Sequence, residues 1–196
     1  MKVVLVSQNI TFVKNRAEYQ DVLDQRFTKF LQKANLTPLY VPNTLSQNNT
    51  LRELLSRVEP EGIVLSGGCN VNEFSKRDLT EKDLLDHAKL RKLPVLGICR
   101  GMQFMASYCG AKLKKVDNHL KVRHRISGEI SGEVNSYHRF ALQNCPLGFS
   151  VISKSQDGEI EAIKNTALKW EGWMWHPERE ETLNVQDLNR VKRLFN

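Results

Sequence analysis

Short apolar segments alternate with amphipathic segments along the first half of the chain. The apolar segments have the length of buried strands, whereas the segments between them repeat their apolar positions every three to four residues, as helices do. The expected elements are a strand over 1–6, a helix over 19–31, a strand over 38–42, a helix over 51–58, a strand over 63–65, a helix over 79–90 and a strand over 93–98. This alternation predicts an α/β fold with a doubly wound, mainly parallel sheet and helices on both faces. Ligands of such sheets bind beyond the carboxyl ends of the strands.

The pattern changes after Gly110, where short strand-like pieces replace the longer helical ones. These pieces are 125–126, 128–130, 133–134, 141–142, 149–152, 160–163 and 170–175. They predict short antiparallel strands and hairpins, followed by an amphipathic closing helix over 185–195. With 196 residues and neither a linker nor an internal repeat, the sequence predicts a single domain over residues 1–196.

One cysteine stands where the strand over 93–98 must turn into a helix. Gly97 and Gly101 flank Cys99, so the backbone can bend tightly there without obstruction from a Cβ atom. The first N–H groups of the new helix favour the thiolate, which is the form that attacks carbonyl groups. The pattern therefore predicts a nucleophile elbow, although a buried cysteine beside two glycines would look the same in sequence.

A cysteine nucleophile needs a base, and histidine is suited to this because its pKa lies near neutrality. His176 follows the apolar segment 170–175, and Pro177 fixes the chain after it. Glu178 lies two residues further on, where a carboxylate can orient an imidazole as the third member of a triad. A loop histidine at the end of a strand is the alternative interpretation.

Backbone donors for an oxyanion hole are expected at the same edge of the sheet. The N–H of Arg100 follows the nucleophile directly. Gly67-Gly68 ends the strand over 63–65 and lets backbone approach a ligand closely, although it is also compatible with a plain turn.

The net charge of +7 fits an anionic small ligand, a solvated basic surface or nucleic acid. The densest basic stretch, 112–125, lacks the interleaved aromatic residues on which bases stack. We therefore expect an anionic small molecule rather than nucleic acid as the partner.

The cysteines and histidines give no metal-binding pattern. The four cysteines form no C-x-x-C pair, which argues against a zinc site and a disulfide framework and favours a reducing, cytoplasmic environment. His119 and His124 lie five residues apart in an expected basic loop and lack a third ligand. The first apolar run is too short for a signal peptide, and no run is long enough for a membrane span. No metal site and no membrane association are expected.

Four segments, 66–68, 97–103, 134–138 and 175–178, resemble in the same order the four signatures of class I glutamine amidotransferase domains. The resemblance implies a flavodoxin-like fold and a catalytic triad of Cys99, His176 and Glu178. It also implies that Gly68 and Arg100 supply the oxyanion N–H groups. The residues that it assigns to the glutamyl end of the substrate are Gly67, Gln103, Asn135, Ser136, Tyr137 and His138.

Arg100 after the cysteine, Trp175 before the histidine and the segment 135–138 look more like the γ-glutamyl hydrolase branch of this family. That branch cleaves γ-glutamyl amides to glutamate and a free amine through a thioester, with neither metal nor redox cofactor. The chain also looks like small hydrolases of bacterial capsule phosphoramidate biosynthesis, whose leaving group carries a pyrophosphate. The basic stretch 112–125 would suit such a leaving group, or it is simply solvated.

Two alternatives stay open from the sequence. A glutaminase subunit that feeds ammonia to a partner synthetase would use the same triad, whereas the hydrolase interpretation expects no obligatory protein partner. A non-catalytic module that binds nucleotides or nucleic acid would use the basic surface instead. Glutamine turnover with and without a partner separates the first alternative, and loss of all amide turnover would favour the second.

Overall fold

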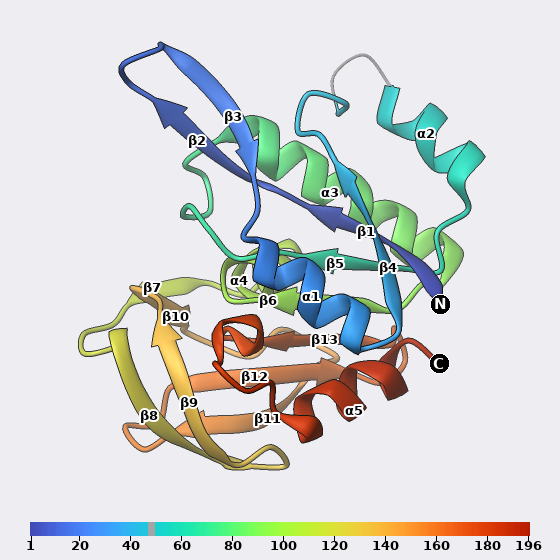
Figure 1. Cartoon of the computed structure of the whole chain (residues 1–196). Helices are drawn as coiled ribbons and strands as arrows, with labels where there is room; N and C mark the ends of the chain where they lie inside the picture. The colour runs from blue at the N-terminus through green and yellow to red at the C-terminus, as the bar shows by residue number, and fades with distance from the viewer. Residues whose placement is uncertain (47–49) are drawn as a thin grey trace.

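A nine-stranded sheet forms the centre of the molecule (Figure 1). This computed structural model describes residues 1–46 and 50–196. In sheet order, the strands are β4 (Leu36–Val41), β1 (Lys2–Ser7), β5 (Gly62–Leu65), β6 (Val95–Ile98), β13 (Trp170–Trp173), β12 (Ile160–Asn165), β11 (Ser150–Ser155), β8 (Leu120–Gly128) and β9 (Gly132–Tyr137). The first five are parallel to one another, and the other four continue the sheet as antiparallel strands. The predicted mainly parallel sheet with an antiparallel C-terminal half is confirmed.

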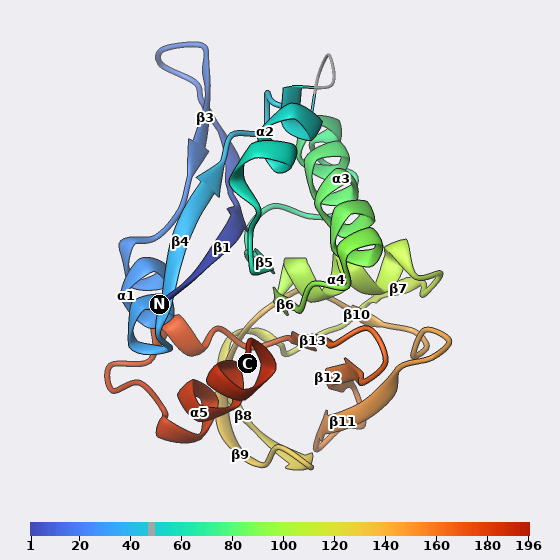
Figure 2. The same cartoon turned by 90° about the vertical axis from the view of Figure 1, so that its right-hand side faces the viewer.

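Helices cover both faces of the parallel half. The helices are α1 (Gln25–Lys33), α2 (Thr50–Val58), α3 (Ser75–Arg91), α4 (Arg100–Tyr108) and α5 (Val185–Leu194). Because side chains alternate along a strand, Val4 and Val6 of β1 join the core cluster of α1 and α5, whereas Leu5 joins the cluster of α2, α3 and α4. Figure 2 shows α1 and α3 on opposite sides of the sheet. This is the flavodoxin-like arrangement of class I glutamine amidotransferases.

The helix predicted over 19–31 is wrong in its first part. Strand β3 (Glu18–Val22) pairs with β2 (Asn9–Val13) in a separate hairpin, which extends away from the sheet in Figure 1. The rings of Phe12 and Tyr19 lie 4.8 Å apart across this hairpin, so Tyr19 packs on a strand partner. Helix α1 begins only after Asp24, whose side chain accepts a hydrogen bond from the Arg26 N–H at 2.9 Å.

The basic stretch 112–125 is not the loop that was expected. It contains β7 (Leu113–Lys115), which pairs with β10 (Phe140–Leu142), and the first half of β8. His119 is buried just before β8, and His124 lies within that strand. The strand predicted over 128–130 is also wrong, because Gly128 ends β8 with φ +139° and the chain bends there before β9. In the described part of the chain, no helix combines the length and apolar character needed to cross a membrane.

Candidate active site

Cys99 lies at the tight turn between β6 and α4. Its backbone has φ 50° and ψ −108°, a left-handed conformation that residues other than glycine rarely adopt. A Cβ atom at Gly97 would lie 2.7 Å from the Met102 nitrogen, and one at Gly101 would overlap the backbone carbonyl of Leu65. The two glycines therefore allow the turn to form, as the sequence predicted. Strained backbone of this kind is characteristic of functional sites.

His176 follows β13, which is the parallel neighbour of β6, so both side chains lie beyond the carboxyl ends of adjacent strands. The Cys99 amide donates to the Trp173 carbonyl at 2.6 Å, which fixes the two strand ends together. His176 Nδ1 lies 2.7 Å from Glu178 Oε1, and both side chains are buried. Burial lowers the pKa of His176, but charge attraction to Cys99 and hydrogen bonding of the imidazolium toward Cys99 and Glu178 raise it to about 9. The raised pKa favours the imidazolium form of His176, which Glu178 orients.

Gly67 and Gly68 follow β5, the other neighbour of β6. A Cβ atom at Gly67 would lie 2.5 Å from His176 Cε1, so only glycine allows this close approach. Gly68 has φ +137°, a conformation in which any other residue would be strained. Within the described residues, the Gly68 and Arg100 amides donate to no protein acceptor. They meet the first requirement for the predicted oxyanion donors.

A buried network that the sequence analysis missed holds the Gly67-Gly68 loop. Arg77 Nη2 donates to the carbonyls of Ser66 at 2.7 Å and of Gly67 at 3.0 Å. Arg77 Nη1 and the Cys69 amide both donate to Asn9 Oδ1 at 2.8 Å. The sequence gives no sign that Arg77 and Asn9 belong together. The one local signal of this network is the spacing of Arg77 and Glu81, which lie four residues apart on α3 and can form an ion pair.

The Arg100 side chain belongs to the same network. The guanidinium is buried and forms ion pairs with Asp78 and Glu81 of α3. Glu81 also accepts from Arg77 Nε at 3.0 Å and from the Ser7 hydroxyl at 2.9 Å. The nucleophile turn and the glycine loop are thus tied to the same fully buried carboxylate.

Most of the residues that the resemblance assigned to the glutamyl end have side chains engaged within the protein. Gln103 Nε2 donates to the Phe140 carbonyl at 2.8 Å, and the Ser136 hydroxyl donates to the His119 carbonyl at 2.6 Å. The Gln103 amide nitrogen and the Ser136 hydroxyl are therefore occupied within the protein, whereas Gln103 Oε1 stays available as an acceptor.

Asn135, Tyr137 and His138 differ in what they contact. Asn135 holds the backbone of His176 on both sides, accepting from its N–H at 2.9 Å and donating to its carbonyl at 2.8 Å. Tyr137 is partly exposed, and its ring meets the His176 ring edge-on at 5.8 Å. The buried His138 side chain turns away from the site toward His119.

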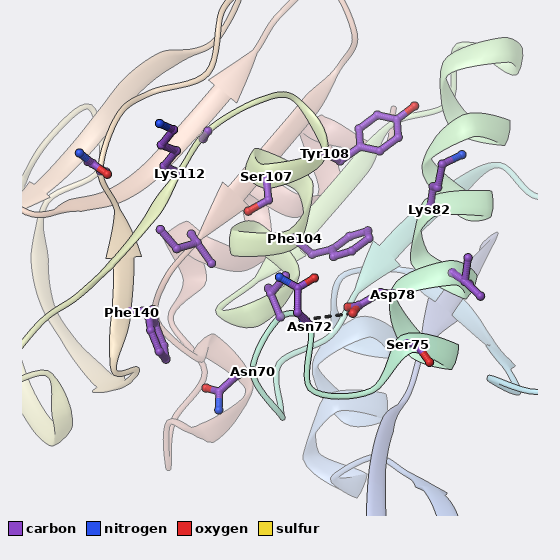
Figure 3. A pocket seen from close by; sticks show the side chains of 15 residues that line it. Asn70, Asn72, Ser75, Asp78, Lys82, Phe104, Ser107, Tyr108, Lys112 and Phe140 are labelled. Atoms are coloured by element: carbon purple, nitrogen blue, oxygen red, sulfur yellow. Dashed lines mark hydrogen bonds between the residues drawn. The ribbon is translucent and has the colours of Figure 1, made fainter.

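A cavity of about 970 Å³ lies beside α4, and none of the triad residues lines it. Its walls come from α3, α4, the loop after Gly68 and the segment after His138 (Figure 3). Figure 3 shows Lys112 on one side and Lys82 on the other, with Phe104 between them. Asn70 and Phe140 line the cavity, and each lies two residues along the chain from a predicted site residue, Gly68 and His138.

Residues 17–192 match the family described as glutamine amidotransferase class-I. The γ-glutamyl-CDP-amidate hydrolase of Campylobacter jejuni subsp. jejuni serotype O:2 is 33% identical over 130 residues, which cover 63% of this chain and 65% of that protein. A GMP synthase (glutamine-hydrolysing) from Blochmanniella floridana is 27% identical, over 71% of this chain but only 30% of its own length. A GMP synthase (glutamine-hydrolysing) subunit from Methanococcus aeolicus is 29% identical over 79% of this chain and 84% of its own.

A solved structure gives the same fold. A protein from Thermoplasma acidophilum described as a putative GMP synthase subunit superposes with a TM-score of 0.77 and 21% sequence identity. The match covers 100% of this chain and 94% of that one.

Proposed function

Because this chain belongs to the class I glutamine amidotransferase family, which supports amide-hydrolase activity, we propose that it hydrolyses a γ-glutamyl amide with Cys99 as nucleophile. The supporting observation is the strained backbone of Cys99 beside the His176–Glu178 pair, at the carboxyl ends of adjacent parallel strands. A merely structural cysteine would not require left-handed backbone, which is unfavourable for any residue with a Cβ atom.

The proposed reaction uses each group in turn. The Cys99 thiolate attacks the γ-carbonyl, and the amides of Gly68 and Arg100 stabilise the developing oxyanion. The imidazolium of His176, held by Glu178, protonates the departing nitrogen and leaves a glutamyl thioester. His176 then takes a proton from water, which attacks the thioester and releases glutamate.

As the specific substrate we propose γ-glutamyl-CDP-amidate, which would give glutamate and a cytidine diphosphoramidate. The name of the Campylobacter relative and the net charge of +7 support this substrate. Lys82 and Lys112 line the cavity beside α4, where they would face the two phosphates. Lys112 is the only lysine of the stretch 112–125 that lines the cavity. Further along the stretch, Arg123 forms ion pairs with Glu133 and Glu180.

A glutaminase that serves a synthetase is the second candidate. The observation that favours it is the match to the GMP synthase subunit from Methanococcus aeolicus, which extends over more of the chain than the match to the hydrolase. A glutaminase needs no phosphate-binding lysines beside the acyl site, because its leaving group is ammonia.

The test is glutamate release from γ-glutamyl-CDP-amidate and from glutamine, with the wild type, Cys99→Ala and Lys112→Ala. Lys115→Ala is the matched control, because Lys115 is an exposed lysine of the same stretch outside the cavity. The proposal expects turnover of the CDP-amidate, none by Cys99→Ala, and a raised KM in Lys112→Ala only. Equal turnover by wild type and Cys99→Ala would overturn the hydrolase assignment. Efficient glutamine turnover alone, unchanged by Lys112→Ala, would favour the glutaminase.

A further inference from the structure

Three histidines and one glutamate meet in the antiparallel half of the sheet, away from the triad. His119 precedes β8, His124 lies within β8, His138 lies between β9 and β10, and Glu161 lies on β12. Ligand atoms of His119, His124 and Glu161 all lie within 4.8 Å of one another. His138 Nε2 adds a fourth, 3.2 Å from His119 Nδ1 and 3.4 Å from Glu161 Oε1. Glu161 offers the third ligating group that the spacing of His119 and His124 along the chain did not reveal.

Hydrogen bonds on the far side of two rings fix which nitrogens face inward. His119 Nε2 lies 2.8 Å from the Asp157 carboxylate, and His138 Nδ1 lies 3.0 Å from the Phe140 carbonyl. Both partners only accept, so these two nitrogens carry the protons. In the neutral rings, His119 Nδ1 and His138 Nε2 then point lone pairs at each other and at Glu161. This far-side pattern is that of metal-bound histidines, whose second nitrogen donates to a carboxylate or a carbonyl.

The inward-facing atoms also lack partners. Within the described residues, neither Glu161 oxygen nor His124 Nε2 makes a hydrogen bond, although the Glu161 side chain is 0% exposed. A buried carboxylate with no donor is strongly destabilising, so it needs a cation or protons from its neighbours. Protons would have to come from His124 Nε2 and from an imidazolium at His119 or His138, whereas one divalent cation would satisfy all these atoms together.

Four of the distances within the cluster are close to those of a tetrahedral site. With metal–ligand bonds of about 2.0–2.2 Å, the ligand atoms of tetrahedral zinc lie roughly 3.3–3.5 Å apart. The His119–His138 distance is 3.2 Å, both rings lie 3.4 Å from Glu161 Oε1, and His124 Nε2 lies 3.5 Å from Glu161 Oε2. Imidazole and carboxylate are also the ligands that zinc accepts in such sites.

We propose that His119, His124, His138 and Glu161 bind one zinc ion as a structural site. The ion would join β8, β12 and the segment after β9, which contains His138. The Ser136 hydroxyl and the His138 N–H both donate to the His119 carbonyl, so a fixed His119 would fix that segment. Zinc would enter past His124, which keeps 13% of its side chain exposed while the other ligands are almost fully buried. The site takes no part in the thioester chemistry.

The experiment is zinc titration of untagged, chelator-treated protein by calorimetry, with melting temperature as the second readout. It is run on the wild type and on Cys99→Ala, which removes the thiol of the proposed active site as a competing zinc ligand. One zinc ion per chain is expected in both, with a melting temperature raised by about 5 °C or more at a hundredfold excess over Kd. Cobalt(II) in place of zinc should give the intense visible absorption of tetrahedral coordination.

Three variants separate this site from zinc bound elsewhere. Glu161→Gln and His124→Gln should lose the tight site, and Asp157→Asn, at a partly exposed carboxylate that supports His119, should weaken binding about 10- to 100-fold. His87→Gln is the control, because His87 lies on α3 outside the cluster. If Glu161→Gln fails to fold, the more exposed His124 and Asp157 variants still decide. Stoichiometric binding that all variants retain, or no binding and no change in melting temperature, would overturn the proposal.

Discussion

Replacing Glu81 by glutamine tests the buried network that holds the nucleophile turn and the glycine loop. Glu81 is fully buried, and its carboxylate accepts from Arg77, Arg100 and Ser7. Glutamine keeps one acceptor for Arg77 and Ser7, but it turns an NH₂ group toward the Arg100 guanidinium, which has only donors. The variant therefore leaves two buried cations with less compensation.

Removing one partner of a buried ion pair destabilises proteins by about 3–5 kcal/mol. The lower end applies here, because Arg100 keeps Asp78 and Arg77 keeps the carbonyls of Ser66 and Gly67. We expect Glu81→Gln to lower the free energy of unfolding by about 3 kcal/mol, which corresponds to roughly 6–12 °C in melting temperature for a protein of this size.

The matched control is Glu53→Gln. Glu53 pairs with Arg57 on α2 at 2.7 Å, also four residues apart, but the two side chains are 63% and 76% exposed. An exposed pair of this kind contributes about 0.5 kcal/mol or less. Urea unfolding of both variants gives the comparison. Equal effects, or a change below about 0.5 kcal/mol in Glu81→Gln, would refute the reasoning that burial makes this network stabilising.

Three further predictions concern the site and its support. His176, with its pKa raised to about 9, should lose its proton and the activity above that pH, and Glu178→Gln should move this alkaline limb of the rate profile to lower pH. Asn135→Ala removes both hydrogen bonds to the His176 backbone, so kcat should fall more than KM rises, and the free energy of unfolding should fall by about 1–3 kcal/mol. A change in KM alone would show a substrate contact instead. Asp187, whose pKa burial raises from 3.8 to about 6, destabilises the folded state as pH rises through that interval. Asp187→Asn should therefore stabilise the folded protein by about 2 kcal/mol at pH 7.5 and have little effect near pH 4. The expected gain is smaller than the whole pKa shift implies, because the N-terminus of α5 favours the charged carboxylate. Thermal unfolding at both pH values measures the difference.

Much of the fold was predictable because its signals are local. Buried parallel strands such as Val95–Ile98 are short apolar runs, and the helices between them repeat at helical spacing. The hairpin of β2 and β3 was not predictable in this way. Residues 19–31 satisfy a helical period, and only the pairing of Tyr19 with Phe12 makes the first of them a strand.

The site likewise has features that the local sequence predicts and contacts that it does not. The elbow at Cys99 follows from its flanking glycines, and the proximity of His176 follows from the order of parallel strands. The partners of the Arg100 side chain are on α3, and Glu161 meets His119 only because β11 joins β12 and β8 in one sheet. Such contacts between distant segments leave no local pattern, so spacing along the chain cannot show them.

The most direct test of the central claim is trapping of the proposed thioester. Wild-type protein mixed with γ-glutamyl-CDP-amidate, or with glutamine, is quenched rapidly in acid, and its intact mass is measured. We predict a population heavier by one glutamyl group, with the modification on the peptide that contains Cys99, and no such species in Cys99→Ala. Release of glutamate by Cys99→Ala at the wild-type rate, with no adduct on Cys99 in the wild type, would contradict the account.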